Sequence, residues 1–380
     1  MQTARYARGL RFLPKVAFTI TTVALISAAI GYQASAQSVY TQPVGFYQVA
    51  ATNGSDTLVT LPFEQVPAFV GTVSAFSGSQ LTGSGSPAWT PTTQWASPNA
   101  EGLMPYYVQI TSGAKAGAVY TITNNDASSL YVQLAPEDLS TVAAGDYLQI
   151  VQFWTLGTAL PASSGIVPST SSLAAGRRTQ VLFPNLAAVG INQAPATQFY
   201  YFNNAWRRSA PSAPATSNFN DVVIEPDQYV TVREATNVTD AVSLLTIGQV
   251  VTNLVRIPLN ASAPPAVGQD NWLGIYRPSS ATLASTGLSN AIVPSVSSLA
   301  AGRRDILEIF DNTSKALNKA PSQQFYYFNN GWRRSAPSAP ATVDFSQTNV
   351  FLTAAGFIVR KSTNGIAGPT TTMWSEPPNY

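Results

Sequence analysis

Short apolar runs, each ended by glycine, asparagine, aspartate or proline, recur along most of the chain. Between residues 37 and 145 they include GFYQV, TLVTLPF, YYVQITS, VYTITN and LYVQL. Runs of this length and spacing predict β-strands rather than helices. Within Tyr106–Leu134 three of them predict a meander, with loops around Gly113 and around Asn124–Asp126. The glycine-, serine- and proline-rich segment Ser77–Ser97 predicts a long surface loop.

The second half of the chain contains a repeat. IVPSTSSLAAGRR, from Ile166 to Arg178, returns as IVPSVSSLAAGRR at an offset of 126 residues. The match resumes in APATQFYYFNNAWRRSAPSAPAT, from Ala194 to Thr216, and its later counterpart has the same offset. YVTVREATN and GFIVRKSTN close the two units with one inserted residue. This self-similarity predicts two homologous modules.

Each unit also predicts its own local structure. QFYYFNN predicts an aromatic strand that turns at Asn203-Asn204 in the first unit and reverses into the Trp-Arg-Arg segment. In the second unit we expect Gly331 to supply the left-handed conformation. SAPSAP predicts a rigid extended connector, and LAAGRR a helical turn that ends at Gly302. Between the units, Ala241–Pro258 predicts two further strands.

The N-terminus has the pattern of a secretory signal peptide. Four basic residues and no acidic one precede the apolar run Val16–Tyr32, which leads to Ala34-Ser35-Ala36. The small residues predict cleavage between Ala36 and Gln37. The alternative is an uncleaved membrane anchor, which has no need of small residues. We therefore expect a secreted or cell-envelope protein with no membrane span after removal of the signal peptide.

Composition and pattern together predict an all-β fold, a multi-module β-sandwich or barrel-like protein with an internal duplication. The aromatic share of 11% is too high for a disordered chain. The predicted parts, in order, are a signal peptide (1–36), an N-terminal β module (37–145), the first repeat module (146–237), connecting strands (238–269), the second repeat module (270–364) and a C-terminal tail (365–380). We expect the two repeat modules to pack with pseudo-twofold symmetry.

Charge argues against a nucleic-acid partner. The signal peptide takes four of the 20 basic residues and none of the 18 acidic ones, which leaves a net charge of −2. Sequence-independent binding to phosphates then has no electrostatic drive.

Several of these segments carry a resemblance. TQPVGFYQV near the expected mature N-terminus, YYVQITSGA, FDNTSKALNKAPSQQFYYFNNGWRR and GFIVRK together resemble a family of exported bacterial proteins of uncharacterised function. The similarity covers nearly the whole mature chain and implies export and a β-rich fold. In the first unit FPNLAAVGINQ replaces FDNTSKALNK, so Asp311 and Lys319 have no charged equivalents there.

The residue types present exclude much catalytic chemistry. Histidine and cysteine do not occur, so His-assisted serine catalysis, Cys–His nucleophiles and ordinary zinc sites are ruled out. Two carboxylates are enough for a glycosidase, but no pair stands out in the sequence. The loops around Asp311 and Asp126 lack the acid spacing of an EF-hand and predict Asx-turns. We expect no cofactor and no metal site.

Arginine doublets beside aromatic residues are the most unusual feature. Paired guanidinium groups next to Trp and Tyr can stack on sugars or bind carboxylates. The alternative, which we favour, is that each Trp fills a module core while one Arg covers an aromatic ring and the other faces water. Exposed Trp side chains would indicate sugar binding, and buried ones a scaffold. The candidate binding residues are Tyr200, Trp206, Arg207, Arg208, Tyr326, Trp332, Arg333 and Arg334.

These features predict an exported, non-enzymatic structural or surface-associated protein that acts through protein–protein contacts. The alternative is a carbohydrate-binding protein that uses the duplicated Trp/Tyr/Arg sites. The corresponding partners are a second copy of the chain or a surface glycan. An enzyme is the third hypothesis, and two carboxylates converging in one cleft would favour it.

Overall fold

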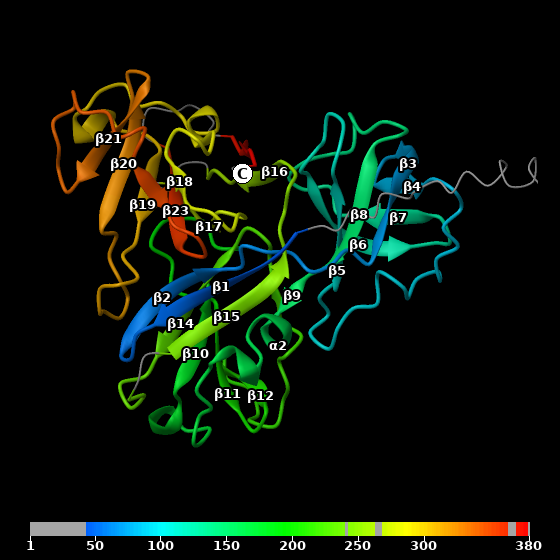
Figure 1. The fold of residues 1–380 in the computed structure, drawn as a ribbon, viewed down its shortest axis with the longest axis horizontal. Coiled ribbons are helices and arrows are strands. Elements are labelled where there is room, and N and C mark those ends of the chain that lie inside the picture. The colour runs from blue at the N-terminus through cyan, green and yellow to red at the C-terminus, as the bar shows by residue number, and fades with distance from the viewer. Residues whose placement is uncertain (1–42, 240–241, 263–267, 364–369, 379–380) are drawn as a thin grey trace, which may run out of the picture. The chain divides into compact units, whose positions relative to one another are not determined.

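A computed structural model describes residues 43–239, 242–262, 268–363 and 370–378. The predicted signal peptide and its cleavage point between Ala36 and Gln37 lie outside the described residues. Residues from Pro43 onward form one compact unit. Strands dominate it, with one four-residue α-helix and four short 3-10 turns among the described residues, so the predicted all-β class is confirmed (Figure 1).

The elements follow one another along the chain in this order: β1 (Val44–Ala51), β2 (Ser55–Thr60), β3 (Phe69–Ser77), β4 (Gln80–Gly83), β5 (Tyr106–Ile110), β6 (Val119–Asn125), β7 (Ser129–Val132), β8 (Tyr147–Gln152), β9 (Trp154–Thr155), α2 (Leu156–Ala159), η1 (Ala162–Ser164), η2 (Ala174–Gly176), β10 (Thr179–Phe183), β11 (Thr197–Phe202), β12 (Ala205–Ala210), β13 (Val223–Ile224), β14 (Tyr229–Glu234), β15 (Val242–Gln249), β16 (Val255–Leu259), β17 (Gly268–Gly274), β18 (Ala281–Thr282), η3 (Leu288–Asn290), η4 (Ala300–Gly302), β19 (Ile306–Ile309), β20 (Gln323–Phe328), β21 (Gly331–Ala336), β22 (Asn349–Phe351), β23 (Gly356–Ser362) and β24 (Thr372–Glu376).

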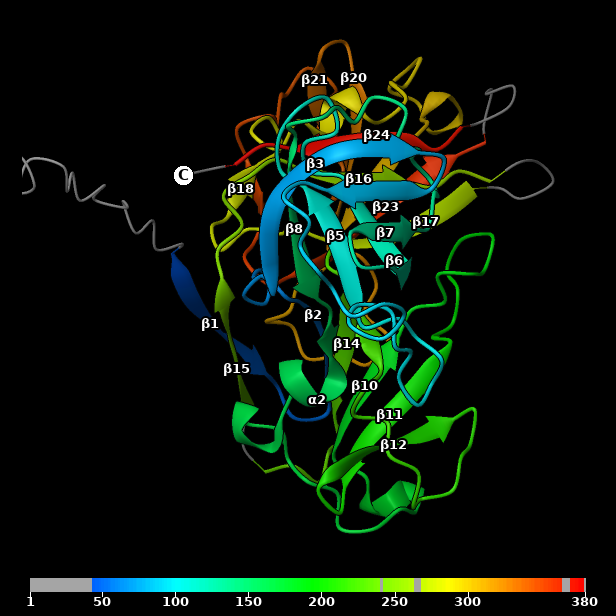
Figure 2. The ribbon, with the colours of Figure 1, turned by 90° about the vertical axis from the view of Figure 1, so that its right-hand side faces the viewer.

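Six strands close a barrel in the order β3-β4-β7-β6-β5-β8 (Figure 2). The predicted meander is present, because β5 pairs with β6 and β6 with β7. The prediction of a surface loop at Ser77–Ser97 is wrong in two respects. Gln80–Gly83 form strand β4, and Trp89 and Trp95 are buried in the barrel core. Burial of these two aromatic side chains holds the segment against the barrel, because exposing them to water would cost the free energy gained by burying their apolar surface.

The rest of the unit consists of two copies of one arrangement of strands. Copy 1 has a five-stranded sheet in the order β12-β11-β10-β14-β2, and copy 2 has β21-β20-β19-β23-β17. Each copy adds a two-stranded sheet, β1-β15 or β16-β24, and a short pair, β13-β9 or β18-β22. The barrel is an insertion between β2 and β9 of copy 1 (Figure 1). Copy 1 therefore spans residues 44–249 around the barrel, and copy 2 spans residues 255–376.

Strand pairing corrects the predicted module boundaries. β1 and β2, assigned to the N-terminal module, belong to the sheets of copy 1, whereas β8, assigned to the first repeat, closes the barrel. The predicted connecting strands are the last strand of copy 1 and the first of copy 2. The C-terminal tail contains β24, whose Trp374 is buried in the copy 2 core. Pairing joins segments far apart in the chain, so sequence order does not reveal these boundaries.

The aromatic hairpins are present in both copies. Asn203 and Asn204 have φ of 49° and 58°, as a type I′ turn requires. In copy 2 the same two positions, Asn329 and Asn330, adopt left-handed conformations, so the prediction for Gly331 is wrong. Gly331 pairs with Phe328 as the first residue of β21. The predicted SAPSAP connector is also wrong, because its first two residues end a strand and a turn follows.

The two copies contact each other reciprocally. In copy 1 the Arg233 guanidinium binds Asp56 on the paired strand through two bonds of 2.6 and 2.8 Å, and it donates to Asn318 Oδ1 of copy 2 at 2.7 Å. In copy 2 Arg360 binds Asp270 at 2.6 and 3.0 Å and donates to Asn192 Oδ1 of copy 1 at 2.8 Å. The backbone N–H of each asparagine in turn donates to the aspartate, at 2.7 Å in both cases. This exchange is the pattern of a twofold interface.

At two positions where equivalent residues face each other across this pseudo-twofold axis, one of the two is a glycine. A Cβ on Gly356 would lie 2.5 Å from Cγ of Tyr229, its counterpart at the start of β14. A Cβ on Gly274 would lie 2.5 Å from Cβ of Thr60. A symmetric homodimer must place identical side chains at such positions, whereas a duplicated chain can combine a large residue with a glycine. The apolar cluster there contains Leu58, Tyr229, Trp272 and Ile358.

Candidate functional site

The predicted aromatic residues of the repeats are inside the fold. Trp206 is 0% exposed and Trp332 is 1% exposed, each in the core of its own copy. Trp206 Nε1 donates to the carbonyl oxygen of Leu160 at 3.1 Å, whereas Trp332 Nε1 has no hydrogen-bond partner in the part of the chain that the structure describes. Tyr200 and Tyr326 are also buried. None of these four side chains presents an open face on which a sugar ring can stack.

Each arginine doublet places one guanidinium over an aromatic ring. Arg208 lies 4.6 Å from the ring centre of Phe219, and Arg334 lies 4.7 Å from that of Phe345. The upstream doublets act in the same way, since Arg177 lies over Tyr200. In copy 2 the corresponding pair is Arg303 and Tyr326. These contacts are cation–π interactions within each copy.

The other arginine of each hairpin, Arg207 or Arg333, does not face open water. The prediction that it would is wrong. Arg207 is only 9% exposed and donates to four backbone carbonyl oxygens. The bonds to those of Thr216 and Ser217 are both 2.8 Å long. Its counterpart Arg333 is mostly buried and lies 3.9 Å from Asp344. The predicted site residues thus lie close together, but their contacts stabilise the hairpin and the loop that follows it rather than form an open binding site.

Three carboxylates, those of Glu225, Asp227 and Asp270, line one cavity, and no sequence pattern predicted it. Glu225 and Asp227, on the turn before β14, border a cavity of about 230 Å³ that also contains Trp272. Burial, and to a lesser degree the charge of Asp227, raises the pKa of Glu225 to about 7. The neighbouring Asp270 is engaged by Arg360. The only sequence signal was the pair of acids flanking a proline, which is common in turns.

A buried polar cluster joins the barrel to both copies. Glu64 accepts bonds of 3.1 and 3.2 Å from Gln149 Nε2 of the barrel and one of 3.3 Å from Gln249 Nε2. Arg277 of copy 2, which is fully buried, also faces the Glu64 charge. Burial raises the pKa of Glu64 to about 7, although these three partners lower it. Nearby, the hydroxyl of Tyr107 lies 3.4 Å from that of a copy 2 tyrosine. The cluster links the three parts of the unit.

An exposed apolar surface lies on the outer side of the β1-β15 sheet. Along both strands buried and exposed residues alternate, and the inner side packs into the copy 1 core. On the outer side Phe46 is 75% exposed, Val44 67% and Ile247 54%, and Leu245 is also exposed. We call this outer side the β1-β15 face. Its residues are Val44, Phe46, Gln48, Ala50, Ser243, Leu245 and Ile247.

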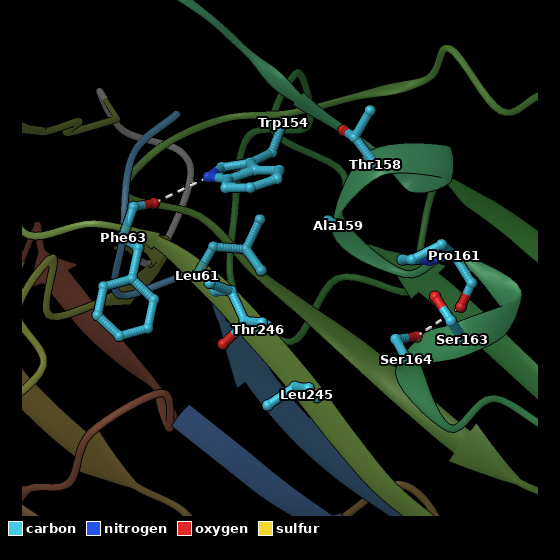
Figure 3. A pocket seen from close by; sticks show the side chains of 11 residues that line it. Leu61, Phe63, Trp154, Thr158, Ala159, Pro161, Ser163, Ser164, Leu245 and Thr246 are labelled. Carbon is cyan, nitrogen blue, oxygen red and sulfur yellow. Dashed lines mark hydrogen bonds between the residues drawn. The ribbon is translucent and has the colours of Figure 1, made fainter. Parts of the chain in front are cut away.

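A small cavity adjoins the β1-β15 face. It has a volume of about 180 Å³ and is lined by β15 on one side and by the α2–η1 region on the other (Figure 3). Trp154 lies at one end, where its Nε1 donates to Phe63 O at 2.9 Å. Ser164 Oγ donates to Pro161 O at 2.7 Å. Because these polar groups are already bonded within the chain, the cavity suits an apolar side chain better than a sugar.

Backbone groups of β15 also face this cavity. Gln249 exchanges two bonds with Glu64, of 2.8 and 3.0 Å, on the edge opposite β1. The N–H and C=O groups of an antiparallel strand alternate between its two edges. The corresponding groups of Ile247 and Leu245 therefore point away from β1, toward the cavity.

The corresponding outer side in copy 2 is partly covered by the barrel. Arg256, on the outer side of β16, forms an ion pair with Glu137 of the barrel. Its backbone N–H donates to Gly117 O at 3.1 Å. Pro258 and Met373 border a cavity whose opposite wall is formed by barrel residues. Of two equivalent faces, one meets another part of the chain and the other is uncovered by the described residues.

The sequence does not predict which side of β1 and β15 is exposed, because both sides of these strands carry apolar residues. Leu244 is buried in the core and Leu245 is exposed, yet nothing in the pair Leu244-Leu245 distinguishes them. Two consecutive leucines in one strand could have indicated the face, because neighbouring residues of a strand point to opposite sides and one of the two sides is expected to be polar.

Comparison of the chain with protein-family models, with curated proteins and with solved structures gave no match. The resemblance to a family of exported proteins therefore stays a prediction. Among the described residues, none of the helices has the length and apolar character needed to span a bilayer.

Proposed function

We propose that this chain is an exported, non-enzymatic structural or surface-associated protein that acts through protein–protein contacts made by the β1-β15 face. The observation that carries the proposal is the set of four large apolar side chains exposed together on this face. The largest exposed apolar patch on a protein is often functional. The N-terminal signal pattern supports a secreted or cell-envelope location.

Burial of the repeated aromatic residues argues against the carbohydrate-binding alternative. Trp206 and Trp332 fill the cores, and their arginine neighbours bind rings and carbonyls of the same chain. The duplication therefore repeats the residues that hold a folded module. This supports the interpretation of the repeats as scaffold.

Site-specific photo-crosslinking in producing cells tests the proposal. A photoreactive residue replaces Phe46 on the face, and in a control it replaces Leu299, which is equally exposed but lies in a copy 2 loop. A discrete adduct at position 46 that is missing at position 299 supports a contact function for the face. If position 46 yields no adduct under conditions in which the protein accumulates, the proposal is wrong.

One observation favours a second candidate, a hydrolase, because Glu225 and Asp227 line a single cavity. Burial raises the pKa of both Glu225 and Asp227, and a raised pKa suits a carboxyl group to act as a general acid. The cavity of about 230 Å³ is, however, smaller than typical ligand pockets of about 300–1,000 Å³. Hydrolysis of chromogenic glycosides that Glu225→Gln abolishes, with unchanged melting behaviour, would establish this candidate in place of the first.

A further inference from the structure

We infer that the partner of the β1-β15 face is the same face of a second copy of this chain, in a twofold-symmetric dimer. This inference rests on the proposed function and specifies its partner. It follows from the charge, the register and the symmetry of the face.

The face contains no charged residue. Its seven residues are three aliphatic side chains, one phenylalanine, one alanine, one serine and one glutamine. In a twofold contact every residue near the axis meets its own equivalent, so a charge there repels itself. A partner of a different kind is ordinarily selected by complementary charge. An uncharged apolar face therefore fits a second copy of itself.

The register makes the face self-complementary. Phe46 and Ile247 are direct cross-strand partners, and Gln48 is opposite Leu245. Side chains paired in this way lie side by side on one side of the sheet. When a second face is rotated by 180° onto the first, Phe46 of each molecule can pack on Ile247 of the other. The two contacts form together, as in an isologous interface.

Both features of the proposed dimer, sheets packed across a twofold axis and a two-stranded sheet covered on its outer side, already occur within the chain. Its two copies pack sheet on sheet across a pseudo-twofold axis through Leu58, Tyr229, Trp272 and Ile358. In copy 2 the outer side of the β16-β24 sheet is partly covered by the barrel. The barrel is inserted in copy 1 and meets copy 2. On the β1-β15 face Gln48 and Ala50 border a cavity shared with copy 2, whereas the four large apolar side chains are left exposed by the described residues.

The size of the face predicts a weak dimer. With the exposed fractions of its four large side chains, it presents roughly 400 Å² of apolar surface, which is typical of the largest patch on a monomer. Stable complexes bury about 800 Å² per partner. We therefore expect a reversible dimer in the micromolar range or weaker, which high local concentration at a surface would favour.

Cysteine crosslinking tests the geometry, since the protein has no cysteine of its own. The chain without residues 1–36, which precede the compact unit, carries single substitutions Val44→Cys, Phe46→Cys, Gln48→Cys or Ser243→Cys. In a twofold contact a position near the axis faces its own equivalent, and sheets packed face to face lie about 10 Å apart, so a bismaleimide reagent of that reach is used as the crosslinker. We expect crosslinked dimers for at least one of these positions and none for the control Leu299→Cys.

Sedimentation velocity from micromolar to millimolar concentration provides the second measurement. Association of the unmodified protein that Phe46→Glu and Ile247→Glu abolish, and Leu299→Glu does not, supports the dimer. All three residues are exposed, so unchanged melting temperatures are expected. A monomer throughout, or a dimer that both face variants retain, overturns the inference. If photo-crosslinking at position 46 captures a different protein while the purified chain stays monomeric, the contact function holds and self-association is wrong.

Discussion

The substitution Gly274→Ala tests the pseudo-twofold interface at its closest point. The added Cβ would overlap Cγ2 of Thr60, and it would lie 2.5 Å from Cβ and 2.7 Å from Oγ1 of the same residue, well inside the 3.5–4.0 Å of a normal contact. Thr60 is buried, and its hydroxyl has no hydrogen-bond partner among the described residues. Overpacking of this kind costs about 1–3 kcal/mol of the free energy of unfolding. Replacing a strand glycine by alanine recovers about 0.5–1 kcal/mol, so the net loss lies between about 0 and 2.5 kcal/mol.

A double-mutant cycle separates this clash from a general loss of stability. Thr60→Gly alone removes buried atoms and adds a strand glycine, and we expect it to destabilise by about 1–2 kcal/mol. Combined with Gly274→Ala it places the glycine at position 60 and a small side chain at position 274, on the other side of the pseudo-twofold axis. The double variant should therefore be more stable than the sum of the single effects by about 1–3 kcal/mol.

Urea unfolding of the four proteins measures these differences. Gly331→Ala is the control, because copy 1 carries Ala205 at the equivalent position and the nearest atoms, 3.0 Å away, belong to the exposed side chain of Asp344. We expect it to change stability by less than about 0.5 kcal/mol. If the effects of Gly274→Ala and Thr60→Gly simply add, the two residues do not oppose each other and the argument for the axis fails.

Three further predictions concern buried groups. Trp206→Phe should reduce the free energy of unfolding by about 1–3 kcal/mol more than Trp332→Phe, because only Trp206 leaves a backbone carbonyl without its donor; urea unfolding of both variants checks this. Stability should fall as pH rises from about 4.5 to about 7, because the folded state binds the protons of Glu64, Glu225, Glu234 and Glu376 more tightly than the unfolded chain; Glu64→Gln should make that part of the thermal stability profile less steep, and an unchanged slope would contradict the role of Glu64. Arg360→Leu leaves Asp270 buried without its cation and should cost about 3–5 kcal/mol, of which additional replacement of Asp270 by Asn recovers part; no recovery in calorimetry would show that the pair does not act as a unit.

The local pattern predicted the elements well where a signal lies within a few residues. The hairpin of β11 and β12 was predicted from an aromatic run followed by Asn203-Asn204, since two residues with positive φ are what the turn needs. The same aromatic run recurs 126 residues further along the chain, and this repetition predicted the second hairpin. Burial of Trp206 and Trp332 followed from the same repetition, because duplicated modules duplicate their core residues.

The sequence by itself therefore determined the β class, the duplication and the burial of the repeated tryptophans, because these depend on periodicity, repetition and turn chemistry. Only the tertiary structure decided the rest. β2 pairs with β14 across the whole inserted barrel, as in the contact of Val59 with Val230, and no local pattern encodes a partner so distant. The outward position of Leu245 beside the inward Leu244, like the glycine required opposite Thr60, depends on what packs against the strand. Such contacts arise only when the chain is folded, and they define both the pseudo-twofold axis and the exposed β1-β15 face.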